Sequence, residues 1–414
     1  MNETTRGKTY REHILTRTFV IIMLMLLVKV GTAGAAPFAY VMSGGDYINT
    51  GNISVIDTVS NTVTDTTNIG GYPGEVAATP DGTKIYVTDS GIASNNVSVI
   101  DTATNTVKAR VNVGGSSWGV VVNPAGTKAY VSIRDSTNIA VIDTVTNSVI
   151  ATVNVNFNPD RLAVTPDGTK IYATNHLNDT TSVIDTATNT VIATVNVGSS
   201  PWDVAVAPDG TKAYVANSNS NNVSVINTSM NTVISTVNVG AYPWGIAINP
   251  AGTRVYVTNM ENDSVSVIDI ATNNVVATVP VGVGPCGVAV TPDGEKVYVV
   301  NYDSNTTSVI DTATNKVIST VNVKAYPIEV AFGYFTGSVT KANSTTESNS
   351  TPLLNHINET ENQTNNTGMT ENVETVDKQE KENTTQTSKK SPFISPIYIF
   401  IILLGVVMHI KKRK

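Results

Sequence analysis

Short runs of β-branched residues, separated by polar turn segments, repeat along the middle of the chain. One repeat carries such runs at Gly245–Ile248, Val255–Thr258, Val265–Ile268 and Val275–Val279. Pro-Asp-Gly or Pro-Ala-Gly joins the first run to the second, and Asp-x-Ala-Thr-Asn joins the third to the fourth. Gly and Asx residues suit the backbone of tight turns, so each repeat predicts four short β-strands.

The repeat returns about every 42 residues across residues 37–337. A tyrosine in the second strand marks seven copies, at Tyr40, Tyr86, Tyr130, Tyr172, Tyr214, Tyr256 and Tyr298. Four strands per unit at this period are typical of a β-propeller blade, and propellers have about four to eight blades. The sequence therefore predicts an all-β, seven-bladed β-propeller of four-stranded blades. A β-helix is the alternative, but its coils are shorter and lack this four-part pattern.

The order of the strands also predicts how the ring closes. The chain enters at a second-type strand around Tyr40 and leaves at a first-type strand, Val330–Phe332. The last strand should therefore complete the blade that the N-terminal strands begin. Closure of this kind removes the open sheet edges that invite aggregation.

The first 36 residues differ from the repeats and predict a secretory signal peptide. Basic residues precede an apolar run at Phe19–Val28, and Ala33 and Ala35 supply an Ala-x-Ala cleavage site. Lys29 interrupts the end of the run, so an uncleaved membrane anchor is the alternative.

Residues 392–410 predict a transmembrane helix. The apolar run Phe393–Ile410 has 18 residues, which in a helix span ~27 Å, close to the hydrocarbon thickness of a bilayer. The basic tail at 411–414 places the C-terminus in the cytoplasm by the positive-inside rule. A buried core helix is the alternative.

Residues 338–391 are rich in Asn, Thr, Ser and Glu and too poor in apolar residues to form a core. Asn-x-Ser/Thr sites recur in this segment and are candidates for glycosylation. They are Asn343, Asn349, Asn358, Asn362, Asn365 and Asn383. The segment is expected to be a glycosylated stalk between the propeller and the membrane.

The recurring Tyr-Val-Thr-Asn, as at Tyr256–Asn259, together with Pro-Asp-Gly-Thr-Lys resembles the YVTN-repeat β-propellers over about residues 38–335. The layout of signal, propeller, stalk and terminal helix is similar to that of archaeal cell-surface and surface-layer proteins. The resemblance implies exposure on the envelope, with a role in the surface coat or in adhesion, but it does not supply an activity. Ser391–Phe393 partly matches an archaeal sorting signal, so processing of the terminal helix is an alternative to its retention.

Charge and composition exclude several functional classes. Charged residues make up 14% of the chain, against about 25% in typical proteins, which excludes a nucleic-acid binder because such proteins need a basic face. One Cys and four His exclude a disulfide scaffold, a zinc finger and a Cys-ligated cluster. The net charge of −7 divides into an acidic middle, −11 over residues 37–337, and basic ends, which indicates membrane topology.

Residues that recur in every blade serve the blade, so function is expected where the blades differ. Two consecutive positions vary in the loops that lead into each inner strand, where propellers line the mouth of the central channel. The first position holds Gly74, Trp118, Asp160, Trp202, Trp244, Cys286 and Ile328. The second position holds Glu75, Gly119, Arg161, Asp203, Gly245, Gly287 and Glu329.

Aromatic residues at this mouth are the first candidate site. Trp118, Trp202 and Trp244 are all the tryptophans of the chain, and Tyr72, Phe157, Tyr242 and Tyr326 lie just before the first variable position. An exposed ring of aromatics predicts binding of sugars or peptides by stacking. The alternative is that each Trp packs between neighbouring blades and fills the mouth.

Acidic residues at the mouth are the second candidate site. Glu75, Asp160, Asp203 and Glu329 could offer oxygen ligands to Ca²⁺. Glu75 and Glu329 should be neighbours across the ring closure. The alternative is a solvated rim whose charges partly pair with one another.

The sequence as a whole indicates a membrane-anchored propeller at the cell surface with a non-enzymatic coat or adhesion role. Envelope or surface-coat components, glycans or peptides are the expected partners, and no cofactor beyond Ca²⁺ is implied. The alternative is an extracytoplasmic enzyme, lactonase-like or oxidoreductase-like, that uses the carboxylates at the mouth. The propeller has no nucleophile elbow, HExxH or P-loop, and its one histidine, His176, lies at the start of an outer loop.

Overall fold

The computed structural model describes residues 37–44, 51–91 and 94–333. The signal peptide, stalk, transmembrane helix and tail expected at 1–36, 338–391, 392–410 and 411–414 lie outside these described residues. Within them, no helix is long and apolar enough to cross a membrane.

The described residues form seven four-stranded antiparallel sheets, the blades. Blade 1 consists of β4 (Pro73–Ala78), β5 (Lys84–Asp89), β6 (Asn96–Asp101) and β7 (Thr106–Asn112). Blade 2 consists of β8 (Ser117–Val122), β9 (Lys128–Ile133), β10 (Asn138–Asp143) and β11 (Ser148–Asn154). Blade 3 consists of β12 (Leu162–Val164), β13 (Lys170–Asn175), β14 (Thr180–Asp185) and β15 (Thr190–Asn196). Blades 4 and 5 consist of β16 (Pro201–Val206), β17 (Lys212–Asn217), β18 (Asn222–Asn227) and β19 (Thr232–Asn238); and β20 (Pro243–Ile248), β21 (Arg254–Asn259), β22 (Ser264–Asp269) and β23 (Asn274–Pro280). Blade 6 consists of β24 (Pro285–Val290), β25 (Lys296–Asn301), β26 (Thr306–Asp311) and β27 (Lys316–Asn322), and blade 7 of β28 (Pro327–Gly333), β1 (Phe38–Ser43), β2 (Asn52–Asp57) and β3 (Thr62–Asn68).

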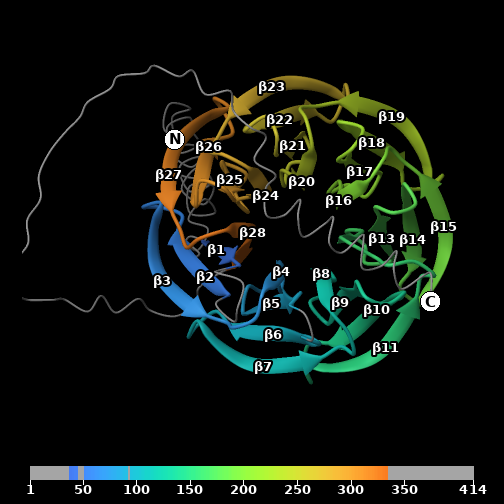
Figure 1. The fold of residues 1–414 in the computed structure, drawn as a ribbon. Coiled ribbons are helices and arrows are strands. Elements are labelled where there is room, and N and C mark those ends of the chain that lie inside the picture. Colours follow the sequence, from blue (N-terminus) through green and yellow to red (C-terminus); the bar gives the residue numbers. More distant parts are fainter. Residues whose placement is uncertain (1–36, 45–50, 92–93, 334–414) are drawn as a thin grey trace, which may run out of the picture. The chain divides into compact units, whose positions relative to one another are not determined.

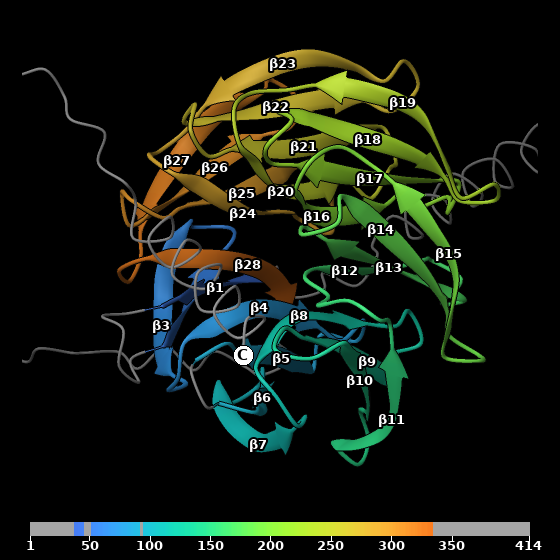
Figure 2. The ribbon, with the colours of Figure 1, turned by 45° about the vertical axis from the view of Figure 1, so that its right-hand side comes forward.

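The blades are arranged around a central axis, which confirms the predicted seven-bladed propeller (Figure 1). The first strand of each blade lies nearest the axis and the fourth lies on the outside. Figure 2 shows the outer strands β15, β19 and β23 following one another around the wall.

The ring closes as the strand order predicts. β28, the last strand, pairs antiparallel with β1, the first, with Val41 opposite Val330. Blade 7 therefore combines the two ends of the described chain, in the order β28-β1-β2-β3. Every blade of the described residues therefore has its full set of four strands.

Burial explains why the inner and outer strands differ in sequence. The middle strands are buried on both faces because each blade packs between two others, and they are rich in Val and Ile. One such inter-blade core contains Tyr40, Met42, Ile53, Val76 and Ile85. The outer strands alternate between exposed and covered positions, as in β15.

The recurring Asn and Tyr residues join neighbouring blades. The turn between the third and fourth strands of every blade holds an Asn with a φ of 51° to 54°, a left-handed conformation that Asn tolerates. At five of the seven interfaces between neighbouring blades, the side chain of this Asn accepts a hydrogen bond from the repeated tyrosine of the preceding blade. The shortest joins Tyr298 to Asn61, at 2.6 Å. These residues therefore serve the ring and not a site.

Candidate functional site

The loops that lead into the inner strands are held in a fixed conformation at the channel mouth. Asn221 accepts a hydrogen bond from the Tyr242 N–H at 2.9 Å, and Asn305 accepts one from the Tyr326 N–H at 2.8 Å. Tyr242 and Tyr326 have φ values of 54° and 56°, which are rare for bulky residues. Ser200, which occupies the same position in blade 4, has a φ of 55° and a matching bond to Asp179. The side chains at this position are therefore displayed on a rigid backbone.

The three tryptophans form one continuous group with Tyr242, here called the aromatic row. The ring centroids of Trp118 and Trp202 lie 6.1 Å apart, those of Trp202 and Trp244 4.1 Å, and those of Trp244 and Tyr242 6.0 Å. Trp118 and Trp202 come from blades 2 and 4, and they meet across blade 3, which carries Asp160 at this position.

The tryptophans are buried, as in the packing alternative that the sequence left open. Trp118, Trp202 and Trp244 are 9%, 2% and 4% exposed. Tyr72, Tyr242 and Tyr326 are partly exposed and supply the accessible aromatic surface.

Each indole N–H of the row is a buried donor with no hydrogen-bond partner among the described residues. An unsatisfied buried donor costs about 1–3 kcal/mol, and such groups usually have a partner. These three donors lie in neighbouring rings below the accessible surface of the mouth.

Arg134, Asp160 and His176 complete the row. The Arg134 guanidinium lies 4.2 Å from the ring centroid of Trp118. The Asp160 carboxylate lies 2.6 Å from His176 Nδ1 and 3.7 Å from Arg134 Nε. Burial lowers the pKa of Arg134, and Asp160 partly offsets this effect. The row therefore has a charged border on the side of blade 3.

Sequence reasoning missed Arg134 and interpreted His176 as an isolated loop residue. Both occupy the position four residues after the repeated tyrosine, where the other blades carry different side chains. That position holds Gly44, Ser90, Arg134, His176, Ser218, Met260 and Tyr302. The same search for differences between blades would have found it.

The second variable position forms a buried ionic cluster on the axis, here called the axial cluster. Arg161 of blade 3 is 1% exposed. It pairs with Glu75 of blade 1 at 2.9 Å and with Glu329 of blade 7 at 3.2 Å. Asp203 of blade 4 also acts on this guanidinium electrostatically. The structure thus brings Glu75 and Glu329 together around one arginine.

Burial raises the pKa of Glu75 to about 7 and that of Glu329 to about 8, although Arg161 acts in the opposite direction. Burial raises the pKa of Asp203 too. One guanidinium faces three carboxyl groups, and low dielectric disfavours the uncompensated charges. The cluster therefore holds protons near neutral pH.

The four acids proposed as calcium ligands do not share one centre. Asp160 contacts His176 and Arg134, while Glu75 and Glu329 contact Arg161. In the part of the chain that the structure describes, no three His, Cys, Asp or Glu side chains are grouped to hold a metal ion. The carboxylates are engaged by cationic side chains, which a Ca²⁺ ion would have to displace.

Two families match parts of the ring. Residues 147–286 match the family described as Choice-of-anchor I domain. Residues 247–333 match the family described as YNCE-like beta-propeller. No curated protein matches the chain.

Several solved structures match most of the chain in fold. A Kuenenia stuttgartiensis hydrazine synthase chain is 25% identical with a TM-score of 0.59, covering 69% of this chain and 97% of that one. A functionally unknown protein from Desulfotomaculum acetoxidans is 19% identical with a TM-score of 0.63, covering 72% and 99%. A Bacteroides uniformis protein described as a candidate 6-phosphogluconolactonase is 16% identical with a TM-score of 0.62, covering 72% and 99%. The shared fold does not by itself choose a function.

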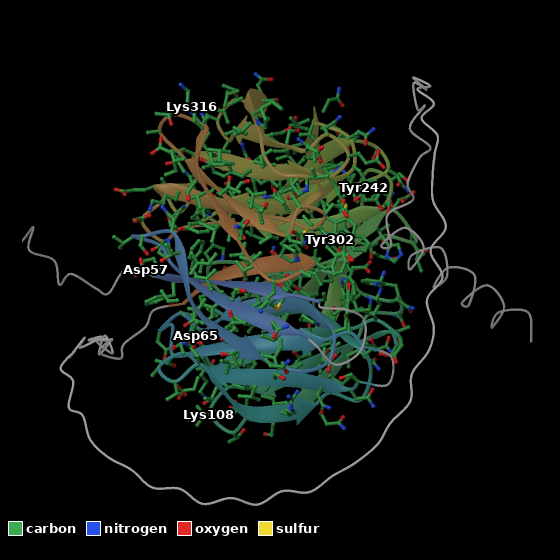
Figure 3. The ribbon with its side chains drawn as sticks, turned by 60° about the vertical axis from the view of Figure 1, so that its left-hand side comes forward. Asp57, Asp65, Lys108, Tyr242, Tyr302 and Lys316 are labelled. Carbon is green, nitrogen blue, oxygen red and sulfur yellow. The ribbon has the colours of Figure 1, made fainter. Side chains whose placement is uncertain are left out.

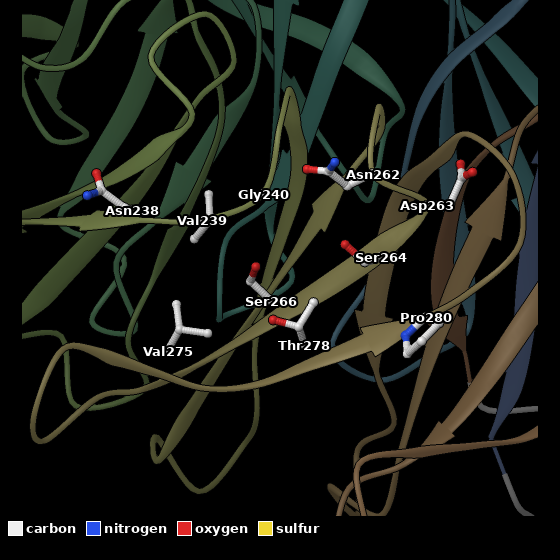
Figure 4. A pocket seen from close by; sticks show the side chains of 10 residues that line it. All are labelled: Asn238, Val239, Gly240, Asn262, Asp263, Ser264, Ser266, Val275, Thr278 and Pro280. Atoms are coloured by element: carbon white, nitrogen blue, oxygen red, sulfur yellow. The ribbon is translucent and has the colours of Figure 1, made fainter.

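A separate groove of about 530 Å³ lies between blades 4 and 5, toward the outside of the ring (Figure 4). Pro280 ends β23 where every other outer strand ends in Asn, so the lining is particular to this seam. It includes no residue of the aromatic row or the axial cluster. The lining residues are Asn238, Val239, Gly240, Asn262, Asp263, Ser264, Ser266, Val275, Thr278 and Pro280.

Proposed function

We propose that the protein stands on the outside of the cell, anchored in the membrane, and binds glycans of the envelope through the loops at the channel mouth without catalysing a reaction. The match to the Choice-of-anchor I domain supports a cell-surface role. The resemblance to YVTN-repeat surface propellers and the apolar run Phe393–Ile410 support the same location.

The observation that carries the proposal is the accessible aromatic surface of Tyr242 and Tyr326 at the mouth, where Tyr242 packs against Trp244 of the aromatic row. Sugars present hydroxyl acceptors and apolar ring faces, which aromatic side chains bind by hydrogen bonding and stacking. Tyr242 and Tyr326 are accessible, and hydrogen bonds from their backbone N–H groups hold their loops in place. Little conformational entropy of the backbone is therefore lost on binding. Tyr242 packs against Trp244, with ring centroids 6.0 Å apart, and Tyr326 packs against Tyr302, with ring centroids 5.2 Å apart.

Binding of the full-length protein, purified in detergent, to a glycan array and to isolated envelope tests this function. In the variant Tyr242→Ser/Tyr326→Ser, each tyrosine is replaced by the residue that blade 4 carries at the same position in the same conformation. We expect at least a tenfold loss of affinity with an unchanged melting temperature. Ser200→Ala is the matched control and should bind as the native protein does. Absence of glycan binding by the native protein, or equal binding by the double variant, contradicts the proposal.

A lactonase-like enzyme is the second candidate, because a carboxyl group with a pKa near 7 beside an arginine suits general acid–base chemistry. Lactone hydrolysis by the native protein that Glu75→Gln abolishes would favour it over the binding role.

A further inference from the structure

Asn-x-Ser/Thr sites occur within the propeller as well as in the segment that follows it. Such a site accepts an N-linked glycan where a transferase reaches both the Asn carboxamide and the hydroxyl group two residues later. A site modified before folding must still fit the folded ring, because a bulky glycan cannot enter a sheet. The structure therefore allows the sites to be compared. They lie at Asn52, Asn96, Asn178, Asn222, Asn227, Asn262 and Asn305.

Five of these sites are closed by the fold. Four of them begin at or just before the third strand of a blade, so the hydroxyl group two residues later is buried in the sheet. At the fifth site, the Ser229 hydroxyl group donates a hydrogen bond of 2.8 Å to the Asn227 side chain itself. The four buried hydroxyl residues, Ser54, Ser98, Ser224 and Thr307, are 0% to 3% exposed.

The two remaining sites occupy the same place in the loops between the second and third strands of blades 3 and 5. In blade 5 the Asn262 side chain accepts a hydrogen bond from the backbone N–H of Ala241. The Ser264 hydroxyl accepts one from the Asn259 side chain at 3.1 Å. In blade 3, by contrast, neither the Asn178 side chain nor the Thr180 hydroxyl has a hydrogen-bond partner among the described residues.

The loop that leads into the inner strand of blade 3 explains this difference. In blades 4 and 6 the residue equivalent to Asn178 accepts a backbone N–H bond from that loop, at 2.7 Å in Ser220 and 3.2 Å in Ser304. In blade 3 the left-handed residue of the loop is Asn156, with a φ of 60°. The inner strand β12 has three residues, against six or seven in the other blades. Asn178 therefore lacks the bond that fixes its equivalents.

The loop itself is held in place while Asn178 stays exposed. The side chain of Asp179, the middle residue of the site, accepts a hydrogen bond from the Ser200 N–H at 2.8 Å. The N–H of His176 donates one to Asp160 at 3.2 Å. Asn178 and Asp179 are both exposed. A glycan at Asn178 would therefore displace no contact of the described ring.

Asn178 lies on the face of the ring that carries the channel mouth. Figure 3 shows two residues from loops of this face, Tyr242 and Tyr302, away from Asp57, which lies in a turn at the opposite ends of the strands. His176, a residue of the charged border of the aromatic row, is in the same loop as Asn178. A glycan on Asn178 would therefore stand beside the row.

We propose that Asn178 carries an N-linked oligosaccharide, transferred from a lipid-phosphate donor outside the cytoplasm. The Asn178 Nδ2 atom forms a bond to the anomeric carbon of the donor sugar, and the bond from that carbon to the phosphate oxygen breaks. The lipid phosphate leaves with the electron pair, and one Nδ2 proton passes to a base of the transferase. The inference rests on the location outside the cell that is proposed above, and not on glycan binding at the mouth.

Mass spectrometry of peptides from the full-length protein, purified from the membranes of its source organism, tests the inference. We expect a glycan on the peptide with Asn178. Thr180→Ala should abolish it and Thr180→Ser should retain it, because either hydroxyl completes the site. Both variants should melt as the native protein does, since the Thr180 hydroxyl has no hydrogen-bond partner among the described residues.

Asn262 is the matched control, at the same place in its loop and also followed by Asp. Its peptide should stay unmodified. Ser264→Thr gives Asn262 the same hydroxyl residue as Asn178 has, and the site should remain unmodified in this variant too, because its side chains stay engaged.

Three results would overturn the inference. An unmodified Asn178 beside modified sites at residues 338–391 would refute it and leave the location outside the cell intact. A chain without a glycan at any site would count against both. Equal modification of Asn178 and Asn262 in Ser264→Thr would mean that free side chains do not select the site.

Discussion

Glu75 and Glu329 share one counter-charge, the buried guanidinium of Arg161. Both carboxyl groups also accept backbone N–H bonds, Glu75 from Val120 at 2.7 Å and Glu329 from Val330 at 3.2 Å. These contacts favour the ionised forms, yet burial has the larger effect and raises both pKa values. The cluster therefore couples protonation to the folding of the ring.

At the scale of these residues we predict that stability falls as the pH rises from about 5 to about 8. Unfolded glutamates release their protons near pH ~4.3, whereas folded Glu75 and Glu329 have pKa values of about 7 and about 8. In this window the folded state binds more protons, so the free energy of unfolding decreases with pH, on the order of a few kcal/mol. Thermal melting at pH 5 and pH 8 measures the change.

The control for this prediction is the double variant Glu75→Gln/Glu329→Gln, whose melting temperature should vary much less over the same range. Aspartates with lowered pKa values, such as Asp143 and Asp269, lose stabilising contacts only below this window. A native melting temperature that rises between pH 5 and pH 8 would contradict the proposed protonation of the cluster.

At the scale of the element, the turn before each outer strand combines a backbone requirement with an inter-blade bond. Asn61 has a φ of 52° and accepts the hydrogen bond of Tyr298 across the last seam of the ring. Asn189 has a φ of 54° in the equivalent turn, but its side-chain oxygen has no hydrogen-bond partner among the described residues. Substitutions at Asn61 and Asn189 therefore separate the cost of backbone strain from the cost of the lost hydrogen bond.

We predict that Asn61→Ala destabilises the ring by about 2–3 kcal/mol, of which roughly 1–2 kcal/mol is left-handed backbone strain and about 1 kcal/mol the lost hydrogen bond. Asn61→Gly should cost only about 1 kcal/mol, because Gly adopts positive φ without strain. Asn189→Ala should show the strain alone. Denaturant unfolding of the three variants measures these differences, and equal costs for Asn61→Ala and Asn61→Gly would contradict the role of the backbone.

The fold was predictable from the sequence because its determinants are local and occur in every blade. The Tyr and Asn of the repeat recur seven times and join neighbouring blades through five hydrogen bonds, and the strand order alone gives the closure by β28. The site depends on distances across the axis, which repeat spacing does not contain. Arg161 reaches Glu75 past blade 2, where Gly119 leaves room for the Glu75 carboxylate. The burial of Trp202 likewise depends on neighbours from other blades.

At the scale of the whole molecule, a single strand makes seven blades into a closed ring. β28 pairs with β1 and also packs against β24 and β4, so it contributes to blade 7 and to both adjoining seams. Its buried residues include Ile328 and Val330, at 8% and 4% exposed. Each such aliphatic side chain stabilises the ring by roughly 1.5–3 kcal/mol, and Glu329 adds its contact with Arg161.

We therefore predict that a chain ending at residue 326, without β28, loses its cooperative melting transition or melts at least ten degrees lower by an order-of-magnitude estimate. It should also aggregate, because β1 becomes an unpaired inner edge. A chain ending at residue 337 is the matched control, since it lacks the same C-terminal segment but keeps β28, and it should melt as the full-length protein does. Calorimetry and light scattering distinguish the two chains. A native-like transition in the shorter one would mean that the six complete blades hold together with an open seam, and that the cooperativity of the ring comes from neighbouring blade contacts alone.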